Sequence, residues 1–283
     1  MLKTEPMPGI SSAIGKAGLL AILLFIGCRT AQSSACRDAE VVSIPNRPTL
    51  ASATDLTQCG VAEVEYGIER QWLTGAAKHT AFAGGIRFGL AQNLDFHWFS
   101  GNLQSSSDSR GSRMGYGDNW FGVKYRLAAQ TKHRPGLGIF YQAKLPTAGP
   151  EVGGTGKVDH SLALLASKDI KRLHFDFNVI PQFMARQLTP GFDHNVGLAW
   201  ATWMPVTRRL TVVFEPYGFS SLNPSTPGFA AAMTGCSFRV HRQMYLDGGV
   251  DFGITDSAPQ KRVYAGATYA VGNIYGWVLG QRN

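Results

Sequence analysis

The residues that most resemble catalytic groups are two Asp-His pairs, Asp159-His160 and Asp193-His194, the first of which is followed by Ser161. Ser, His and Asp together could form a nucleophilic triad. Neighbouring residues of a strand point to opposite faces, however, so Asp159 and His160 could not share a site there. The sequence also has no Gly-x-Ser-x-Gly elbow. We therefore expect no enzyme activity and place both histidines at a rim or in loops.

Phosphate and metal chemistry have equally weak signals. Gly153-Gly-Thr-Gly156 lacks the Lys and Ser/Thr of a phosphate-binding loop, and the sequence has no CxxC motif or Cys/His cluster with metal spacing. No cofactor or metal is expected. Cys36 and Cys59 could pair in an oxidising compartment, or they could remain free thiols like Cys236. The sequence leaves both possibilities open.

The larger set of chemically active side chains consists of acids and bases at every second position. Such side chains lie on one common face only if the chain is extended, as in a β-strand. Glu63 and Glu65, for example, alternate with Val64 and Tyr66. Such alternation has the period of a strand. It recurs in segments of about ten residues, which predict about twelve strands between residues 60 and 272. Short and long connections also alternate, as in transmembrane barrels. The short turns are 91–93, 169–172, 207–209 and 241–243.

Composition decides which face of these strands is the inner one. The chain has 283 residues, of which only 16% are charged and 11% are aromatic, with 33 glycines. In a soluble sandwich the apolar face would be the core, whereas in a membrane barrel it meets lipid. Low charge favours the barrel, and glycines inside strands provide tight bends and room for facing side chains. Aromatic residues expected on the lipid face, near strand ends, are Tyr66, Trp98, Phe99, Tyr125, Tyr141, Trp200 and Tyr269.

The polar face then lines the lumen. Charges in such a wall are tolerated as pairs or in water, so we expect cross-strand networks, such as Glu63 and Glu65 with Arg262 across the seam between the first and last strands. A role in holding the barrel together is favoured over solute contact, and a neutral Arg262→Ala variant would argue against both. The lumen-lining candidates are Glu63, Glu65, Arg87, Asp95, Asp118, Lys124, Arg126, Lys144, Asp176, Glu215, Asp247, Asp251 and Arg262.

The N-terminal region has the pattern of a targeting signal. An apolar run at 19–26 follows basic residues and precedes small ones, which predicts a signal peptide over residues 1–35, cleaved after Ala35. Lipidation at Cys28 is the alternative. Residues 36–59 look irregular and could fold into the lumen as a plug, so that deleting 36–55 should raise leakage. The barrel itself is predicted over 60–283. Twelve strands are intermediate in size, which favours a narrow, gated or plugged pore.

Several short motifs, in a specific order, resemble the family labelled "MetA-pathway of phenol degradation", a group of proposed outer-membrane β-barrel transporters. They are Pro48–Gln58, Gly60–Gly67, Arg87–Asp95, Gly117-Asp118, Gly122–Arg126, Lys144–Thr147, Gly156–His160, Phe192–Asn195 and Leu246–Gly253. The resemblance covers roughly residues 45–275 and implies uptake of aromatic or other hydrophobic compounds. One departure concerns the end, because many outer-membrane barrels finish on an aromatic residue and this chain ends at Asn283. Either the last strand ends earlier, or residues 275–279 form or extend it.

The sequence therefore predicts an all-β, antiparallel transmembrane barrel in the outer membrane of a Gram-negative bacterium. Its expected function is a channel or transporter for small hydrophobic or aromatic compounds. The alternative is a barrel that does not transport and has a structural, adhesive or assembly role in the envelope. Expected partners are outer-membrane lipid, such solutes and the outer-membrane assembly machinery. The net charge of +8 comes from scattered bases, so no nucleic-acid partner is expected.

Overall fold

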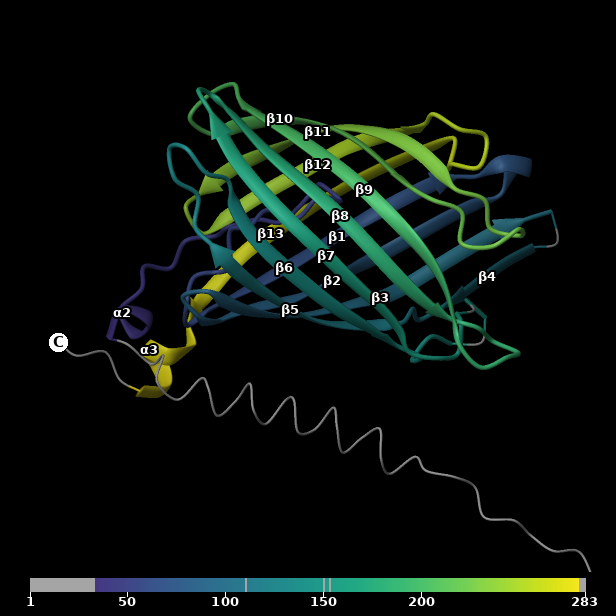
Figure 1. Ribbon diagram of the computed structural model, residues 1–283, viewed down its shortest axis with the longest axis horizontal. Helices are drawn as coiled ribbons and strands as arrows, with labels where there is room; N and C mark the ends of the chain where they lie inside the picture. Colours follow the sequence, from purple (N-terminus) through teal and green to yellow (C-terminus); the bar gives the residue numbers. More distant parts are fainter. Residues whose placement is uncertain (1–33, 110, 150, 153, 280–283) are drawn as a thin grey trace, which may run out of the picture.

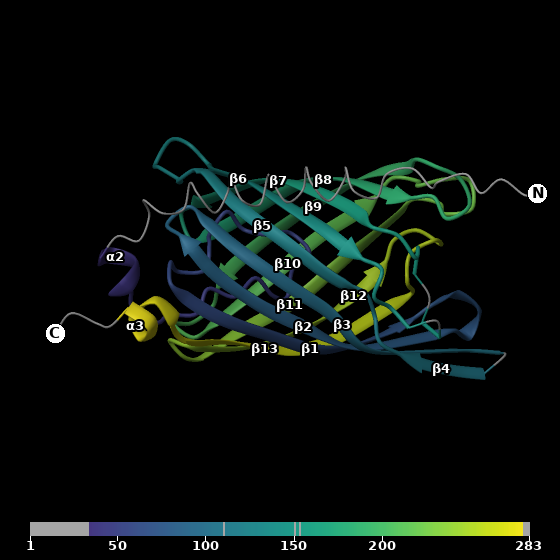
Figure 2. The same ribbon diagram turned by 90° about the horizontal axis from the view of Figure 1, so that it is seen from below.

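The strands of this protein close into a single antiparallel barrel. The structure, a computed structural model, describes residues 34–109, 111–149, 151–152 and 154–279. Its thirteen-stranded sheet closes because β2 pairs with both β1 and β3, while β4 is a short addition to β3 beyond the ring. The ring thus has twelve strands (Figures 1 and 2), which confirms the predicted fold class. The strands are β1 (Val61–Trp72), β2 (Lys78–Ala91), β3 (Leu94–Asp108), β4 (Gly111–Gly115), β5 (Asn119–Ala128), β6 (Gly136–Leu145), β7 (Asp159–Ile170), β8 (Leu173–Ala185), β9 (Phe192–Pro205), β10 (Leu210–Phe219), β11 (Phe229–His241), β12 (Met244–Gly253) and β13 (Lys261–Asn273).

The two faces of the ring differ as the alternation predicts. Large apolar side chains are exposed on the outside, among them Leu198, Trp200 and Phe214, and charged side chains are buried inside, among them Arg87 and Glu215. A closed antiparallel barrel with an apolar exterior is the architecture that spans the outer membrane of Gram-negative bacteria, in agreement with the predicted location. In the described part of the chain, no helix has the length and apolar character needed to cross a membrane.

The aromatic residues expected on the lipid face lie there with one exception. Trp98, Tyr125 and Tyr269 are each more than a third exposed on the outer surface. Phe99 was predicted wrongly, because it faces the lumen beside His97, with ring centroids 5.6 Å apart. Trp98 and Phe99 are adjacent in β3, so they must point to opposite faces. That a residue is aromatic does not by itself indicate contact with lipid in this barrel.

The end of the barrel that carries the short turns also carries both described α-helices, α2 (Ser34–Arg37) and α3 (Ile274–Leu279) (Figure 1), whereas the 3-10 turn η2 (Thr74–Ala76) lies between β1 and β2. Of the two alternatives for the end of the chain, the structure shows the one in which the last strand ends earlier, since residues 274–279 are helical. Asn273 ends β13, and its side-chain oxygen accepts a hydrogen bond from the amide of Gly276 at 2.9 Å. An Asn in this position caps the first turn of a helix. The chain therefore leaves the sheet at Asn273.

The same end holds the start of the described N-terminal region. Cys36 and Cys59 form a disulfide with their Cα atoms 4.9 Å apart, which decides between the two possibilities that the sequence left open. The side-chain amide of Asn273 donates to the carbonyl oxygens of Cys36 and Arg37 at 2.9 and 3.0 Å. The predicted signal peptide and its alternative at Cys28 lie outside the described residues, apart from Ser34 and Ala35. Residues 37–58 thus form a loop that is tied at both ends to one end of the barrel.

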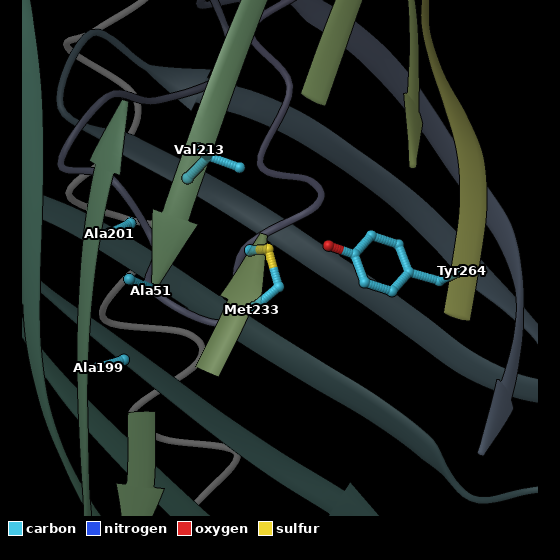
Figure 3. Close-up of a cluster of buried hydrophobic side chains, with 6 residues drawn as sticks. All are labelled: Ala51, Ala199, Ala201, Val213, Met233 and Tyr264. Carbon is cyan, nitrogen blue, oxygen red and sulfur yellow. The ribbon is translucent and has the colours of Figure 1, made fainter. Parts of the chain in front are cut away.

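This loop enters the barrel, as the purple trace after α2 shows in Figures 1 and 2. Ala51 is buried in a cluster with residues of four strands (Figure 3), and the hydroxyl of Tyr264 points toward Met233 across it. The other wall residues of the cluster are small, which leaves room for the main chain of the loop inside the ring. They are Ala199, Ala201 and Val213.

Candidate functional site

The candidate site is the lumen together with residues 43–57, which we call the inner segment. Its first part is held by acids of β1. Glu63 accepts a hydrogen bond from the amide of Ile44 at 2.6 Å, and Glu65 accepts one from the amide of Asn46 at 2.8 Å. Both carboxylates are almost completely buried. Predicted lumen acids therefore serve as acceptors for main-chain amides that have no strand partner.

The middle of the inner segment is held in the same way by the opposite wall. Glu215 of β10 accepts hydrogen bonds from the amides of Leu50 and Ala51 at 2.8 and 2.6 Å. Asn178 of β8 accepts from the amide of Ser52 at 2.7 Å and donates back to its carbonyl oxygen at 3.0 Å. The segment consequently bridges walls that lie on different sides of the ring.

Cations of the wall bind carbonyl oxygens of the segment. The ammonium group of Lys124 donates to the carbonyls of Ala53 and Asp55 at 3.2 and 2.9 Å. Asp95 accepts from the amide of Thr57 at 3.0 Å, and its other oxygen lies 2.9 Å from Nε2 of His97. A buried lysine and a buried aspartate are thus both satisfied through the segment or through a neighbouring side chain.

Arg87 of β2 joins the wall acids to the segment. Its guanidinium forms an ion pair with Glu63 and another with Glu65 at 2.9 Å, and it donates to the carbonyl oxygen of Ile44 at 2.5 Å. The Arg87 side chain is only 1% exposed. Two carboxylates and one arginine that are all buried depend on each other, because removing one partner leaves the others without compensation.

Arg47 is the basic side chain that the inner segment itself contributes. Its guanidinium donates to Asp247 of β12 from Nε at 3.1 Å and from Nη2 at 3.1 Å. It lies against Gly67 and Gly266, where a Cβ atom would come within 2.4 and 2.5 Å of Nη2. These glycines of β1 and β13 therefore make room for the arginine.

Arg262 does not pair with Glu63 and Glu65 as we expected. It forms ion pairs with Asp251 at 2.5 Å and Glu69 at 3.3 Å. The register explains the error, since Arg262 lies opposite Gln71, near the long-loop end of β1, whereas Glu63 lies opposite Arg87. Asp251 also accepts from the hydroxyl of Tyr217 at 2.6 Å.

The remaining candidates lie nearer the two ends. Lys144 forms ion pairs with Asp118 at 3.0 Å and Asp159 at 2.6 Å. Asp176 accepts hydrogen bonds from Ser167 at 2.6 Å and from the indole of Trp203 at 3.0 Å. Arg126 stands apart, because it donates to the carbonyl of Gln92 at the short-turn end and contacts none of the other candidates.

Sequence reasoning missed several lumen residues. His97 and Asn178 lie two positions after the predicted Asp95 and Asp176, so the same parity could have found them. Trp203, Tyr217 and Tyr264 also face inward. Assigning aromatic residues to the lipid face leaves out Trp203 and Tyr217, whereas Tyr264 shares the parity of the predicted Arg262 and could have been found in the same way as His97.

The Asp-His pairs do not form a catalytic set. Asp159 faces the lumen, while His160 lies on the other face with Nδ1 2.8 Å from the hydroxyl of Tyr141. Asp193 pairs with Arg186 at 2.6 Å, and the ring of His194 contacts Phe183. Among the residues that the structure describes, no three His, Cys, Asp or Glu side chains gather as a metal site would require.

A cavity of about 350 Å³ lies in the lumen beside the inner segment. Amide and hydroxyl groups of Gln142, Ser161 and Gln182 line part of it. Asn46, Thr49 and Ser52 of the inner segment and Asn178 of β8 add further uncharged polar groups, and the other half of the lining is apolar. The apolar residues are Leu50, Phe99, Trp120, Phe140, Ala163, Ile180 and Phe219. We call this space the lumen cavity; its lining contains no Asp, Glu, Lys or Arg side chain.

Replacing Arg262 with Ala should lower the free energy of unfolding by about 1–2 kcal/mol, since Asp251 and Glu69 lose charged hydrogen-bond donors in a partly exposed setting. Denaturant midpoints of the folded, heat-modifiable band on gels would measure this. Arg126→Ala, at the short-turn end, is the matched control. If Arg262→Ala changed neither stability nor permeability, both the structural and the solute-contact interpretation would be wrong.

Comparison with known proteins gives a fold and no close relative. No protein-family model matches the sequence, and no curated protein matches it. Among solved structures, the COG4313 outer membrane channel from Pseudomonas putida F1 is similar with a TM-score of 0.60 at 12% identity, over 82% of this chain and 98% of that one. The NanC porin is similar with a TM-score of 0.52 at 10% identity, over 74% of this chain and 98% of that one. At such identities the likeness establishes the fold, that of outer-membrane β-barrels.

Proposed function

We propose that this protein is an outer-membrane channel for small, uncharged hydrophobic or aromatic molecules. The observation that carries the proposal is the lumen cavity. Aromatic rings line it, uncharged amides and hydroxyls provide the hydrogen bonds, and the charged residues of the lumen are engaged elsewhere. Such a lining suits a flat apolar solute with one or two polar atoms and disfavours ions.

The inner segment is, in this proposal, the plug that closes the lumen to water. It binds Glu63, Glu65, Lys124 and Glu215, so the groups that would attract ions in an empty lumen are occupied. The charged networks then serve two purposes, because they hold the wall together and hold the plug in place.

Two further lines support a channel. Solved structures with this fold include a protein described as an outer membrane channel and another described as a porin. The short motifs that resemble the phenol-degradation family point toward aromatic or hydrophobic solutes, but no family model matches the sequence, so the solute class rests on the lumen cavity. Outer-membrane lipid and the outer-membrane assembly machinery are the partners that such a barrel requires.

Entry of the uncharged fluorophore phenylnaphthylamine into cells with an intact outer membrane tests the proposal. Cells that produce the protein should take it up faster than cells that lack it. In Phe99→Ala/Trp120→Ala, loss of two rings should slow entry by about tenfold, since each aromatic contact contributes about 0.5–1.5 kcal/mol. Trp98→Ala, the lipid-facing neighbour, is the matched control and should behave as the wild type.

The alternative is a barrel that does not transport. The dense hydrogen bonding of the inner segment favours it, because a lumen sealed in this way could serve a purely structural role. Equal entry of phenylnaphthylamine into cells with and without the protein would favour this alternative.

A further inference from the structure

Two prolines interrupt the strand pairing of the barrel wall. In the register of β9 with β10, both of which the structure describes in full, Phe214 pairs with Thr202 and Tyr217 with Ala199, and no pair lies between them. Pro216 lies in this gap and has no amide hydrogen to donate. Proline is rarely found inside paired strands for this reason. The seam between β9 and β10 is thus weakened at this level.

Strands β8 and β9 form a hairpin, and a second interruption lies on its other side, between β7 and β8. In the register of β7 with β8, Ser161 pairs with Gln182 and Leu164 with Val179, again with no pair between them along these fully described strands. Pro181 lies in this gap. The pairing of β8 with β9 is continuous from His174 to Ala185. The β8–β9 hairpin is therefore an intact unit with a weak seam on each side.

The outer surface is hollowed over the first of these seams. A hollow of about 580 Å³ is lined almost entirely by apolar side chains of β8 to β11 and of the residue after β12. Leu198 and Trp200 on its rim are 51% and 53% exposed, so they face the membrane. This hollow is accessible to solutes dissolved in lipid.

The lumen cavity reaches the same stretch of wall from inside. Phe219 lines both the lumen cavity and the outer hollow. Its ring packs over Gly197, where a Cβ atom would come within 2.4 Å of it, and stacks on Phe229 at 5.5 Å. Its strand partner Gly197 and its neighbour Gly218 carry no side chain. Phe219 is therefore a residue that borders both spaces.

We propose that an uncharged apolar solute leaves the lumen cavity sideways, between β9 and β10 into the membrane, with Phe219 as the gate. This inference rests on the proposed function and adds the route by which the solute leaves the lumen. The direct path along the barrel is filled by the inner segment, whose main chain is bonded to Asn178 and Glu215 on this very wall. Movement of the β8–β9 hairpin at its two weak seams would open the side path while Glu215 of β10, outside this hairpin, still holds the plug.

A disulfide across the weak seam tests the route. Thr202 and Phe214 are opposed in the register next to the gap. Opposed residues of antiparallel strands have Cα separations compatible with a disulfide. The variant Thr202→Cys/Phe214→Cys would be made in a Cys236→Ser background. Leu246→Cys/Ala267→Cys, an opposed pair in the continuous seam of β12 with β13, is the matched control. The single variant Thr202→Cys controls for the side-chain change.

The cross-linked variant should lose the entry of phenylnaphthylamine, down to the rate of cells that lack the protein, while both controls keep the wild-type rate. Pro216→Val, which restores an amide donor without a cross-link, should also slow entry, and Phe219→Ala should speed it. Wild-type entry in both the cross-linked variant and Pro216→Val would overturn the side route and leave the channel proposal intact. No entry through the wild-type protein would overturn both proposals.

Discussion

A variant in which residues 44–57 are replaced by a glycine-serine linker of equal length should conduct ions about an order of magnitude better than the wild type, because a twelve-stranded ring without its filling is wide enough for water. The ring should still close, since its ladders do not involve the segment. Water would then solvate Glu63, Arg87, Lys124 and Glu215 in place of the lost main-chain groups. Single-channel recordings in planar bilayers would measure the change. The disulfide between Cys36 and Cys59 stays in this variant, so the linker remains tied at both ends.

Replacement of the long loop 221–227 by a linker of the same kind is the control for that experiment. This loop connects β10 to β11 outside the ring and donates no hydrogen bond to the lumen acids named above. It should insert into bilayers and conduct as the wild type does. Equal conductance of the wild type and the segment replacement would show that residues 44–57 do not close the pore.

Arg87→Ala should lower the free energy of unfolding by about 3–5 kcal/mol, the cost of leaving buried carboxylates without their cation. Glu63 would keep the amide of Ile44 as a partner, and Glu65 would keep the amide of Asn46 and the hydroxyl of Thr268, but neither would keep a cation. Water entering the lumen would offset part of this cost, and a rise in ion conductance should then accompany the loss of stability. Denaturant midpoints in lipid vesicles, read from the heat-modifiable band, would measure the stability.

The triple variant Glu63→Gln/Glu65→Gln/Arg87→Met separates charge from packing. It removes all three charges but keeps an oxygen acceptor for each of the two amides, so most of the lost stability should return. Arg126→Ala removes an arginine from the same lumen parity at the rim and should cost less than about 1 kcal/mol. An Arg87→Ala variant as stable as the Arg126→Ala variant would contradict the ion-pair network.

The strand pattern could be predicted from sequence because it depends on local order. A period of two, with acids and bases at alternate positions, specifies which side chains share a face. The apolar face indicates contact with lipid, where a sheet must close into a ring because its edge strands would otherwise have unpaired main-chain groups. Glu63, Arg87 and Glu215 were placed in the lumen on this basis alone. Arg126 shows the limit of parity, because it shares the face but lies at the rim, outside the network.

Partners across the lumen could not be predicted, because they depend on register and on a segment without regular structure. Arg262 was matched with the wrong acids, since the sequence does not state that it lies opposite Gln71. Phe99 was placed in lipid, since an aromatic residue suits either an apolar cavity or a membrane. The hydrogen bonds between the inner segment and the wall could not be predicted either, because residues 43–57 have no periodic pattern that would place their amides.

The sequence by itself thus determined that the chain forms a membrane barrel of about twelve strands and which of its charges face inward. The tertiary structure decided where those charges find partners: with one another through the register, and with the main chain of residues 43–57. It also decided that Pro181 and Pro216 interrupt the seams on the two sides of the β8–β9 hairpin, which contributes residues to the lumen cavity. The physical reason is that alternation is a property of neighbours in the chain, whereas burial and pairing inside a closed ring are properties of residues far apart in it.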